Sequence, residues 1–268
     1  MRSGVARTLR ALPTLFRIGV AETIAYRAEF LVWMLTSTMP LINLALWTTV
    51  AGEAPFRGYT SADFVAYFLA TMIVRNLTGN WVAWQMSEEI RTGTMAMRLL
   101  RPVHPFIALA ASQGAALPLR SLVALPIATI LLVSSGSSVL THDPLQLAVL
   151  APSIVIAWLL TFVILFAIGA LSFWITQSMA IANLYFGLFS LLSGYLLPLD
   201  LMGPVGRIAS WLPFRYMLSA PVELMTKQLT RDEVLRLLAG QLVWTAILLA
   251  VALAIWRRGV KRFEAVGA

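Results

Sequence analysis

The sequence contains no cysteine, which excludes disulfide bonds, thiolate metal sites and cysteine nucleophiles. Charged residues are also scarce: they make up 12% of the chain, against about 25% in soluble domains. Lysine occurs only at Lys227 and Lys261, and histidine only at His104 and His142. Each of these shortages excludes a class of chemistry.

A P-loop needs a lysine within Gly-x-x-x-x-Gly-Lys-Ser/Thr, and neither lysine has that context. The chain therefore does not bind ATP through this motif. The two histidines are expected at opposite membrane faces, where they cannot share a metal ion or form a catalytic dyad. No Gly-x-Ser-x-Gly nucleophile elbow occurs either. We expect no catalytic site, no metal site and no cofactor in this chain.

What the sequence does contain is apolar residues, which account for 59% of its 268 residues and give a mean hydropathy of +0.82. This composition is typical of integral membrane proteins. The formal charge is +8. In a membrane protein, basic loops facing an anionic leaflet explain that excess better than nucleic-acid binding does.

The hydropathy pattern predicts an all-α membrane protein that forms a single transmembrane domain over residues 1–268. Six apolar runs are long enough to cross the bilayer, since about twenty helical residues span its ~30 Å hydrocarbon core. Residues 1–28 carry arginines and apolar residues at helical spacing, which suits an interfacial amphipathic helix or, equally, a plain cytoplasmic flank. Pro118 and Pro126 are expected to kink the third span without breaking it. The predicted spans are residues 30–50, 62–85, 106–133, 145–173, 179–197 and 240–256.

The distribution of basic residues predicts the orientation of these spans. With both termini in the cytoplasm, twelve Lys and Arg residues lie on the cytoplasmic side and six on the outer side. Lys and Arg near span ends are retained in the cytoplasm, so this arrangement is favoured. It makes the connector between spans two and three cytoplasmic.

That connector, residues 86–105, is the most polar stretch between the apolar runs. Ser87 is a candidate N-cap, with Glu88 and Glu89 in the first turn of a short helix. Gly93 would permit a bend, and Pro102 would end the element. We interpret the stretch as an amphipathic helix that docks on a soluble partner. The alternative is an interfacial loop whose arginines only enforce topology.

Several motifs in a fixed order resemble the membrane subunit of an ABC type-2 (ABC-2) exporter. They are the Glu-Ile-Arg-Thr-Gly-Thr and Leu-Leu-Arg-Pro-Val sequences within residues 89–103, Ser-Gly-Tyr-Leu-Leu-Pro-Leu-Asp at 193–200, Trp-Leu-Pro-Phe-Arg-Tyr at 211–216 and Pro-Val-Glu at 221–223. The resemblance covers nearly the whole chain. It implies a coupling helix between spans two and three, and extracellular re-entrant helices between spans five and six.

The resemblance also implies partners. These are two cytoplasmic ATPase subunits, which bind ATP and Mg²⁺, and a second permease subunit in a homodimer or heterodimer. It places the chain in the plasma membrane of a prokaryote. The residues expected to couple to the ATPase are Glu88, Glu89, Arg91, Gly93, Leu99, Leu100, Arg101 and Pro102.

Two arginines, Arg75 and Arg120, fall inside predicted spans, where a charge costs at least about 2.5 kcal/mol on insertion scales. No carboxylate lies at a matching depth. Their ligands are expected to be Asn76, Gln113, Asn183, backbone carbonyls or a partner subunit. We consider Arg75, Arg120 and Asn183 as candidates for lining a substrate path. The alternative is a structural role for both arginines.

The end of the fifth span is a candidate outer gate formed by Tyr195, Leu196, Leu197 and Pro198. Gly194 and Pro198 would allow the helix to break there. Residues 204–223 would then fold back as short re-entrant helices. The alternative is an ordinary span end with an aromatic anchor.

Two other functions remain open for the whole chain. One is a membrane scaffold or accessory protein with no transport cycle. The other is a secondary transporter, for which we find neither inverted repeats nor buried ion-binding carboxylates. The sequence contains no feature that identifies a substrate.

Overall fold

The computed structural model describes residues 2–25, 39–175 and 177–266, and within these ranges it is helical with no strand. The longer helices are α1 (Arg2–Ala25), α3 (Met39–Val50), α4 (Ser61–Thr78), α5 (Val82–Arg91), α7 (Pro105–Gly114), α8 (Leu117–Val133), α9 (Pro144–Ala170), α10 (Ser178–Leu192) and α14 (Arg231–Val266). The shorter ones are α6 (Met95–Leu99), η1 (Ser135–Val139), η2 (Leu171–Phe173), η3 (Leu199–Met202), α11 (Gly203–Ala209), α12 (Pro213–Met217) and α13 (Ser219–Thr226). The all-helical prediction is confirmed for the described residues.

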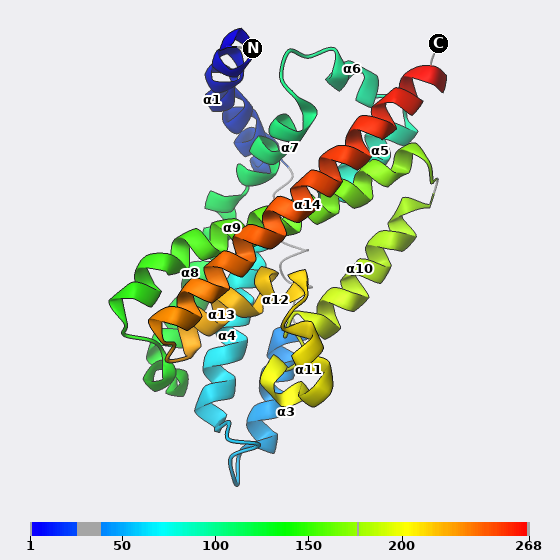
Figure 1. Ribbon diagram of the computed structural model, residues 1–268. Helices are drawn as coiled ribbons and strands as arrows, with labels where there is room; N and C mark the ends of the chain where they lie inside the picture. The colour runs from blue at the N-terminus through cyan, green and yellow to red at the C-terminus, as the bar shows by residue number, and fades with distance from the viewer. Residues whose placement is uncertain (1, 26–38, 176, 267–268) are drawn as a thin grey trace.

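Helix α9 is the centre of the molecule. It packs against α14, α5, α13, α4, α12 and α10, and Figure 1 shows α9 and α14 crossing the molecule side by side. Phe162 and Phe166 on α9 are fully buried and contact the rings of Phe106 and Trp256. Gly169 lets α5 approach closely, because a Cβ there would lie 2.8 Å from the Met86 Cβ atom. The apolar core therefore fixes α5 onto the central helix.

The two ends of the molecule hold different segments. The start of α1, helix α6 and the end of α14 share one end, and the α3–α4 turn and α11 lie at the opposite end (Figure 1). This arrangement agrees with the prediction that both termini and the polar connector share one membrane face. Which end faces the cytoplasm stays a prediction.

Three helical stretches in the described residues are long and apolar enough to cross a membrane: Pro105–Val133, Pro144–Phe173 and Arg231–Phe263. Helices α3 and α10 are shorter but also apolar. Part of the first predicted span, residues 30–38, lies outside the described residues, as do residues 26–28 of the predicted interfacial helix. The last helix begins at Arg231 and is longer than the predicted span 240–256.

The predicted second span, residues 62–85, is two helices and not one. Helix α4 ends at Thr78, Gly79 is extended with φ −61° and ψ 147°, and α5 begins at Val82. The predicted third span contains α7 and α8, which are separated by Ala115 and Ala116 in helical backbone conformation and together make up the stretch Pro105–Val133. Pro118 lies in the first turn of α8, where its missing N–H leaves no unpaired donor, so it begins a helix and does not kink one.

Helix α1 continues through Pro13 as a single helix, and its second half packs against α7. Phe16, Ile18 and Ile24 remain exposed. An apolar, exposed surface beside Arg10 and Arg17 is what a helix at the membrane interface presents to lipid.

Candidate functional site

The break between α4 and α5, residues 79–81, lies between two arginines, one on α4 and one on α8. Arg75 is about 21 Å along α4 from Ser61, and Arg120 is about 20 Å along α8 from Val133, at 1.5 Å per residue. Helix η1 follows α8 and packs against α4 at Val65 and Ala66. Farther along both helices, the Arg120 Nη1 atom lies 3.7 Å from an added Cβ at Gly79, four residues after Arg75. The two cations therefore lie at a similar depth in the helical bundle.

Arg120 is 5% exposed, and its Nη1 atom has no hydrogen-bond partner among the described residues. The guanidinium lies against the break, because a Cβ added to Gly79 would be 3.7 Å from Nη1. Asn80 in the break is 7% exposed, and its Nδ2 atom also lacks a partner. Buried polar groups in native proteins are nearly always hydrogen-bonded, so two unpaired donors beside one break are unusual.

Arg75 points from α4 towards α10. Its guanidinium carbon is 5.9 Å from the ring centroid of Phe186 and 5.2 Å from that of Phe189. These are cation–π distances. The Phe189 ring centroid is also 6.2 Å from that of Tyr195 in the predicted gate, so Phe189 contacts both Arg75 and this segment.

The ligands expected for the two arginines from the sequence are engaged elsewhere. Asn76 donates to the Met72 carbonyl at 2.9 Å, and Gln113 bonds to Trp81 and Gln85. Asn183 lies exposed on α10, and no hydrogen bond between described residues joins it to either arginine. None of the ion pairs between described residues includes Arg75 or Arg120.

A continuous chain of hydrogen bonds leaves the same break in the other direction. The Trp81 amide donates to Gln113 Oε1 at 3.0 Å, and Gln113 Nε2 donates to Gln85 Oε1 at 3.0 Å. Gln85 Nε2 then donates to Glu89 Oε1 at 3.1 Å. Arg98 donates to the Glu89 carboxylate from Nε at 2.7 Å and from Nη2 at 2.5 Å, so the chain ends at Arg98 on the short helix α6.

The polar connector has the predicted short helix, but the predicted cap is wrong. Ser87 lies inside α5, which begins at Val82, and Glu88 and Glu89 are in its last turns. The apolar residues before Ser87 continue the helix because Val82, Ala83 and Met86 bury one face against α9. The short helix is α6, which follows a turn where Gly93 has a φ of +77°.

The two acidic residues of the connector differ in surroundings. Glu88 pairs with Arg91 at 2.5 Å, with side chains 58% and 67% exposed. Glu89 pairs with Arg98, and both side chains are 18% exposed. A shielded bidentate pair holds its geometry more firmly than an exposed one, so Glu89 fixes α6 onto α5.

Helix α6 has a buried anchor and an exposed surface. Met95 is fully buried, Leu99 packs against the core, and Met97 and Leu100 are 67% and 80% exposed. The α6 surface, as we call it, is formed by Met97, Leu100 and the exposed arginines Arg91 and Arg101, and Pro102 follows it.

At the predicted gate, α10 ends at Leu192 and not at Leu197. Gly194 has a φ of +86°, and the Tyr67 hydroxyl donates to its carbonyl at 2.7 Å. Tyr195, Leu196 and Leu197 are half-buried, and Pro198 is buried at the start of η3. The short helices η3, α11, α12 and α13 follow, and α13 packs against both α4 and α9.

A polar cluster holds this end of the molecule together. Lys227 pairs with Asp200, which also accepts from the Tyr59 hydroxyl at 3.1 Å, and Arg215 pairs with Glu223 at 2.8 Å. Burial alone would raise the pKa of Asp200, but Lys227 and Tyr59 lower it below its ordinary 3.8. Burial, and then the Asp200 charge, raise the pKa of Tyr59.

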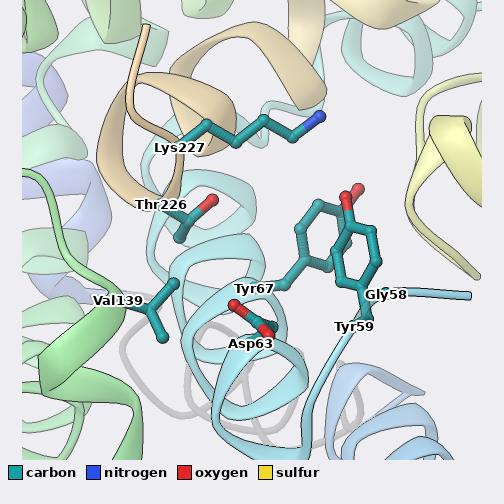
Figure 2. A pocket seen from close by; sticks show the side chains of 7 residues that line it. All are labelled: Gly58, Tyr59, Asp63, Tyr67, Val139, Thr226 and Lys227. Carbon is teal, nitrogen blue, oxygen red and sulfur yellow. The ribbon is translucent and has the colours of Figure 1, made fainter. Parts of the chain in front are cut away.

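A small cavity of about 110 Å³ lies beside this polar cluster. Figure 2 shows its lining, with the Tyr59 and Tyr67 hydroxyls on the side towards which Lys227 extends. The cavity is too small for a drug-sized ligand, which needs at least about 300 Å³.

A comparison with known protein families identifies the family of this chain. The family model described as "ABC-2 family transporter protein" matches residues 31–267, which is most of the chain. The chain belongs to the ABC-2 transporter family. The resemblance carried by the sequence motifs is thereby confirmed. A search of curated proteins finds no match to this ABC-2 protein.

Membership makes the chain a multi-pass membrane component of a transporter, with ABC ATPase subunits as its partners and no catalytic role of its own. In the described residues, no group of three or more His, Cys, Asp or Glu side chains could hold a metal ion.

The sequence analysis did not predict the roles of three residues in the ABC-2 protein. Asn80 has in the break a donor that is unpaired among the described residues, Gln85 belongs to the hydrogen-bonded chain, and Arg98 pairs with Glu89. Two signals were available. Gln85 and Gln113 are isolated amides within apolar runs, where a polar side chain needs a partner, and Arg98 follows Glu89 across a turn-forming glycine.

Proposed function

We propose that this ABC-2 protein is the permease subunit of an ATP-driven exporter in the plasma membrane of a prokaryote. It works as a dimer, with separate cytoplasmic ATPase subunits that bind ATP and Mg²⁺. The observation that carries the proposal is the hydrogen-bonded chain from Arg98 on α6 to Trp81 in the α4–α5 break. It offers a physical route from a cytoplasmic surface into the interior of the bundle.

The α6 surface is the proposed contact with the ATPase. Leu100 and Met97 provide an apolar edge, and Arg91 and Arg101 provide charges around it, as in helix-in-groove recognition. Glu89 and Arg98 hold α6 to α5, while Gly93 and Pro102 delimit the element. Movement of the ATPase subunits would displace α6, and the chain through Gln85 and Gln113 would carry that displacement to the break.

The substrate path is proposed at the dimer interface. Asn183 is a polar side chain exposed on the membrane helix α10, where a second permease would cover it. Arg75 and Arg120 face the path from inside the subunit, and Tyr195, Leu196, Leu197 and Pro198 close its outer end. Cross-linking Leu197→Cys to its counterpart should stop transport, and continued transport would refute the gate.

Co-purification tests the docking surface. The permease is expressed with the ATPase subunit of the same transporter, and the complex and its ATP hydrolysis are measured. Leu100→Asp should weaken the complex about tenfold or more, since it buries a charge at the centre of the contact. Leu235→Asp is the matched control, because Leu235 is 60% exposed near the start of α14, whereas it is the end of α14 that shares one end of the molecule with α6 (Figure 1).

An unchanged complex with both Leu100→Asp and Arg101→Glu would contradict docking through α6. A permease that binds no ATPase subunit at all would favour the scaffold function over the exporter.

A further inference from the structure

The α4–α5 break gathers positive charge without any compensating negative charge. Arg75 and Arg120 both adjoin Gly79: the Gly79 N–H donates to the Arg75 carbonyl at 3.2 Å, and an added Cβ at Gly79 would lie 3.7 Å from Arg120 Nη1. No carboxylate among the described residues pairs with either of them. Two like charges at this depth are costly unless something neutralises them.

At the break there are also two buried side-chain donors without an acceptor among the described residues. Arg120 Nη1 and Asn80 Nδ2 are buried without partners, and Arg120 lies against Gly79. Gly79 itself is half-buried and has no side chain, so a ligand can approach the backbone there. Unpaired buried donors of this kind mark a position where an acceptor belongs.

We propose that the α4–α5 break binds the phosphate group of an amphiphilic anion, with Arg120, Arg75 and Asn80 as its ligands. A phosphate monoester carries about −1.5 to −2 at neutral pH, which matches the two arginines. Guanidinium groups also bind phosphate oxygens through paired hydrogen bonds. A single carboxylate would leave one positive charge unpaired.

The apolar surroundings indicate that the phosphate belongs to an amphiphile. Phe186, which is half-buried, lies beside Arg75, and the site is roughly 20 Å along α4 and α8 from Ser61 and Val133. A hydrocarbon tail gains free energy by lying against such an apolar surface, whereas an inorganic ion does not. The role of this ligand as the exported substrate rests on the proposed function, but its binding does not.

Binding is tested on the purified full chain in neutral detergent, by thermal unfolding at increasing probe concentration. Dodecyl phosphate is the probe, and dodecylphosphocholine has the same tail but no net charge. A ligand that binds only the folded state raises the unfolding temperature in a saturable way. We expect this for dodecyl phosphate and not for dodecylphosphocholine.

Charge-removing variants assign the effect to the site. Arg120→Gln and Arg75→Gln should each weaken dodecyl phosphate binding about tenfold to a hundredfold, the range for one charged hydrogen-bonding group. Arg207→Gln is the matched control, since Arg207 is exposed on α11. Equal affinity in all three variants and the unchanged chain would overturn the proposal.

A second variant separates lost binding from misfolding. Without ligand, Arg120→Met removes an unpaired buried charge and should unfold at the same or a higher temperature than the unchanged chain. If it unfolds at a markedly lower temperature, Arg120 is a structural residue and the site is refuted. Inorganic phosphate that binds as tightly as dodecyl phosphate would overturn the amphiphile and assign a soluble anion.

The two proposals fail separately. Arginine-dependent binding in a permease that recruits no ATPase subunit would retain this site and remove the exporter. An intact, ATP-hydrolysing complex whose permease binds dodecyl phosphate without dependence on Arg75 or Arg120 would retain the exporter and remove this site.

Discussion

Gly194, which follows the end of α10 at the predicted gate, is a residue whose replacement the fold should tolerate poorly. It combines a left-handed φ of +86° with close packing, because an added Cβ would collide with the Ser219 hydroxyl and lie 2.5 Å from that of Tyr67. Tyr67 also donates to its carbonyl. Conformation and packing together explain why glycine occupies the position where α10 gives way to the short helices.

We predict that Gly194→Ala lowers the free energy of unfolding by about 3 kcal/mol, combining left-handed strain with overpacking. Gly58→Ala is the matched control: its φ is +88°, but nothing lies within 4 Å of an added Cβ. It should cost only about 1–2 kcal/mol. Thermal unfolding in detergent measures both, and equal losses would show that packing at Gly194 is unimportant.

At the scale of elements, the α5–α6 connection contains two ion pairs with different expected roles. Glu89→Gln removes the charge that Arg98 binds and leaves a shielded cation without a counter-ion. Glu88→Gln removes an exposed pair worth at most about 1 kcal/mol. We predict that limited proteolysis within residues 92–102 accelerates about tenfold or more for Glu89→Gln and little for Glu88→Gln. Equal rates would mean that Glu89 does not hold α6.

The polar cluster that contains Asp200 should stabilise the fold less at acidic pH. Because the pKa of Asp200 is lower in the folded protein than its ordinary 3.8, its carboxylate stabilises the fold above about pH 4, and this is lost as the pH falls through the folded-state value. Asp200 is 56% exposed, so solvent screening limits the effect to about 1 kcal/mol or less. Asp200→Asn should abolish this part of the pH dependence of unfolding, whereas a profile unchanged by the substitution would contradict it.

For the whole molecule, the absence of cysteine makes orientation directly testable. Single cysteines at Leu100 on the α6 surface and at Arg207 on α11 are exposed at opposite ends. In intact cells, a membrane-impermeant maleimide should label the cysteine at position 207 and not the one at position 100. The reverse pattern would invert the predicted topology.

How far the sequence predicts this molecule depends on the range of the interaction. Apolar runs and basic flanks act locally, so the helices, the polar connector and the family were recognisable. The break after Thr78 was not, because the apolar residues on both sides of residues 79–81 predict one continuous span, and the Trp81 amide finds its partner in Gln113 on another helix. The cap at Ser87 failed for a similar reason: burial of Met86 against Gly169 extends α5 across it. The pairing of Glu89 with Arg98 depends on the geometry of the turn at Gly93, which the sequence permits but does not by itself define.

The hydrogen-bonded chain between Trp81 and Glu89 has a sense of direction. Every bond in it runs donor to acceptor towards Glu89, whose carboxylate can only accept. The other end is fixed as well, because the Trp81 backbone N–H can only donate. Both glutamine amides therefore have a single orientation that satisfies every bond of the chain. The direction is thus set twice, by a backbone donor in the break and by a carboxylate beside α6 two helical turns away, so a neutral amide at position 89 would leave Trp81 alone to set it.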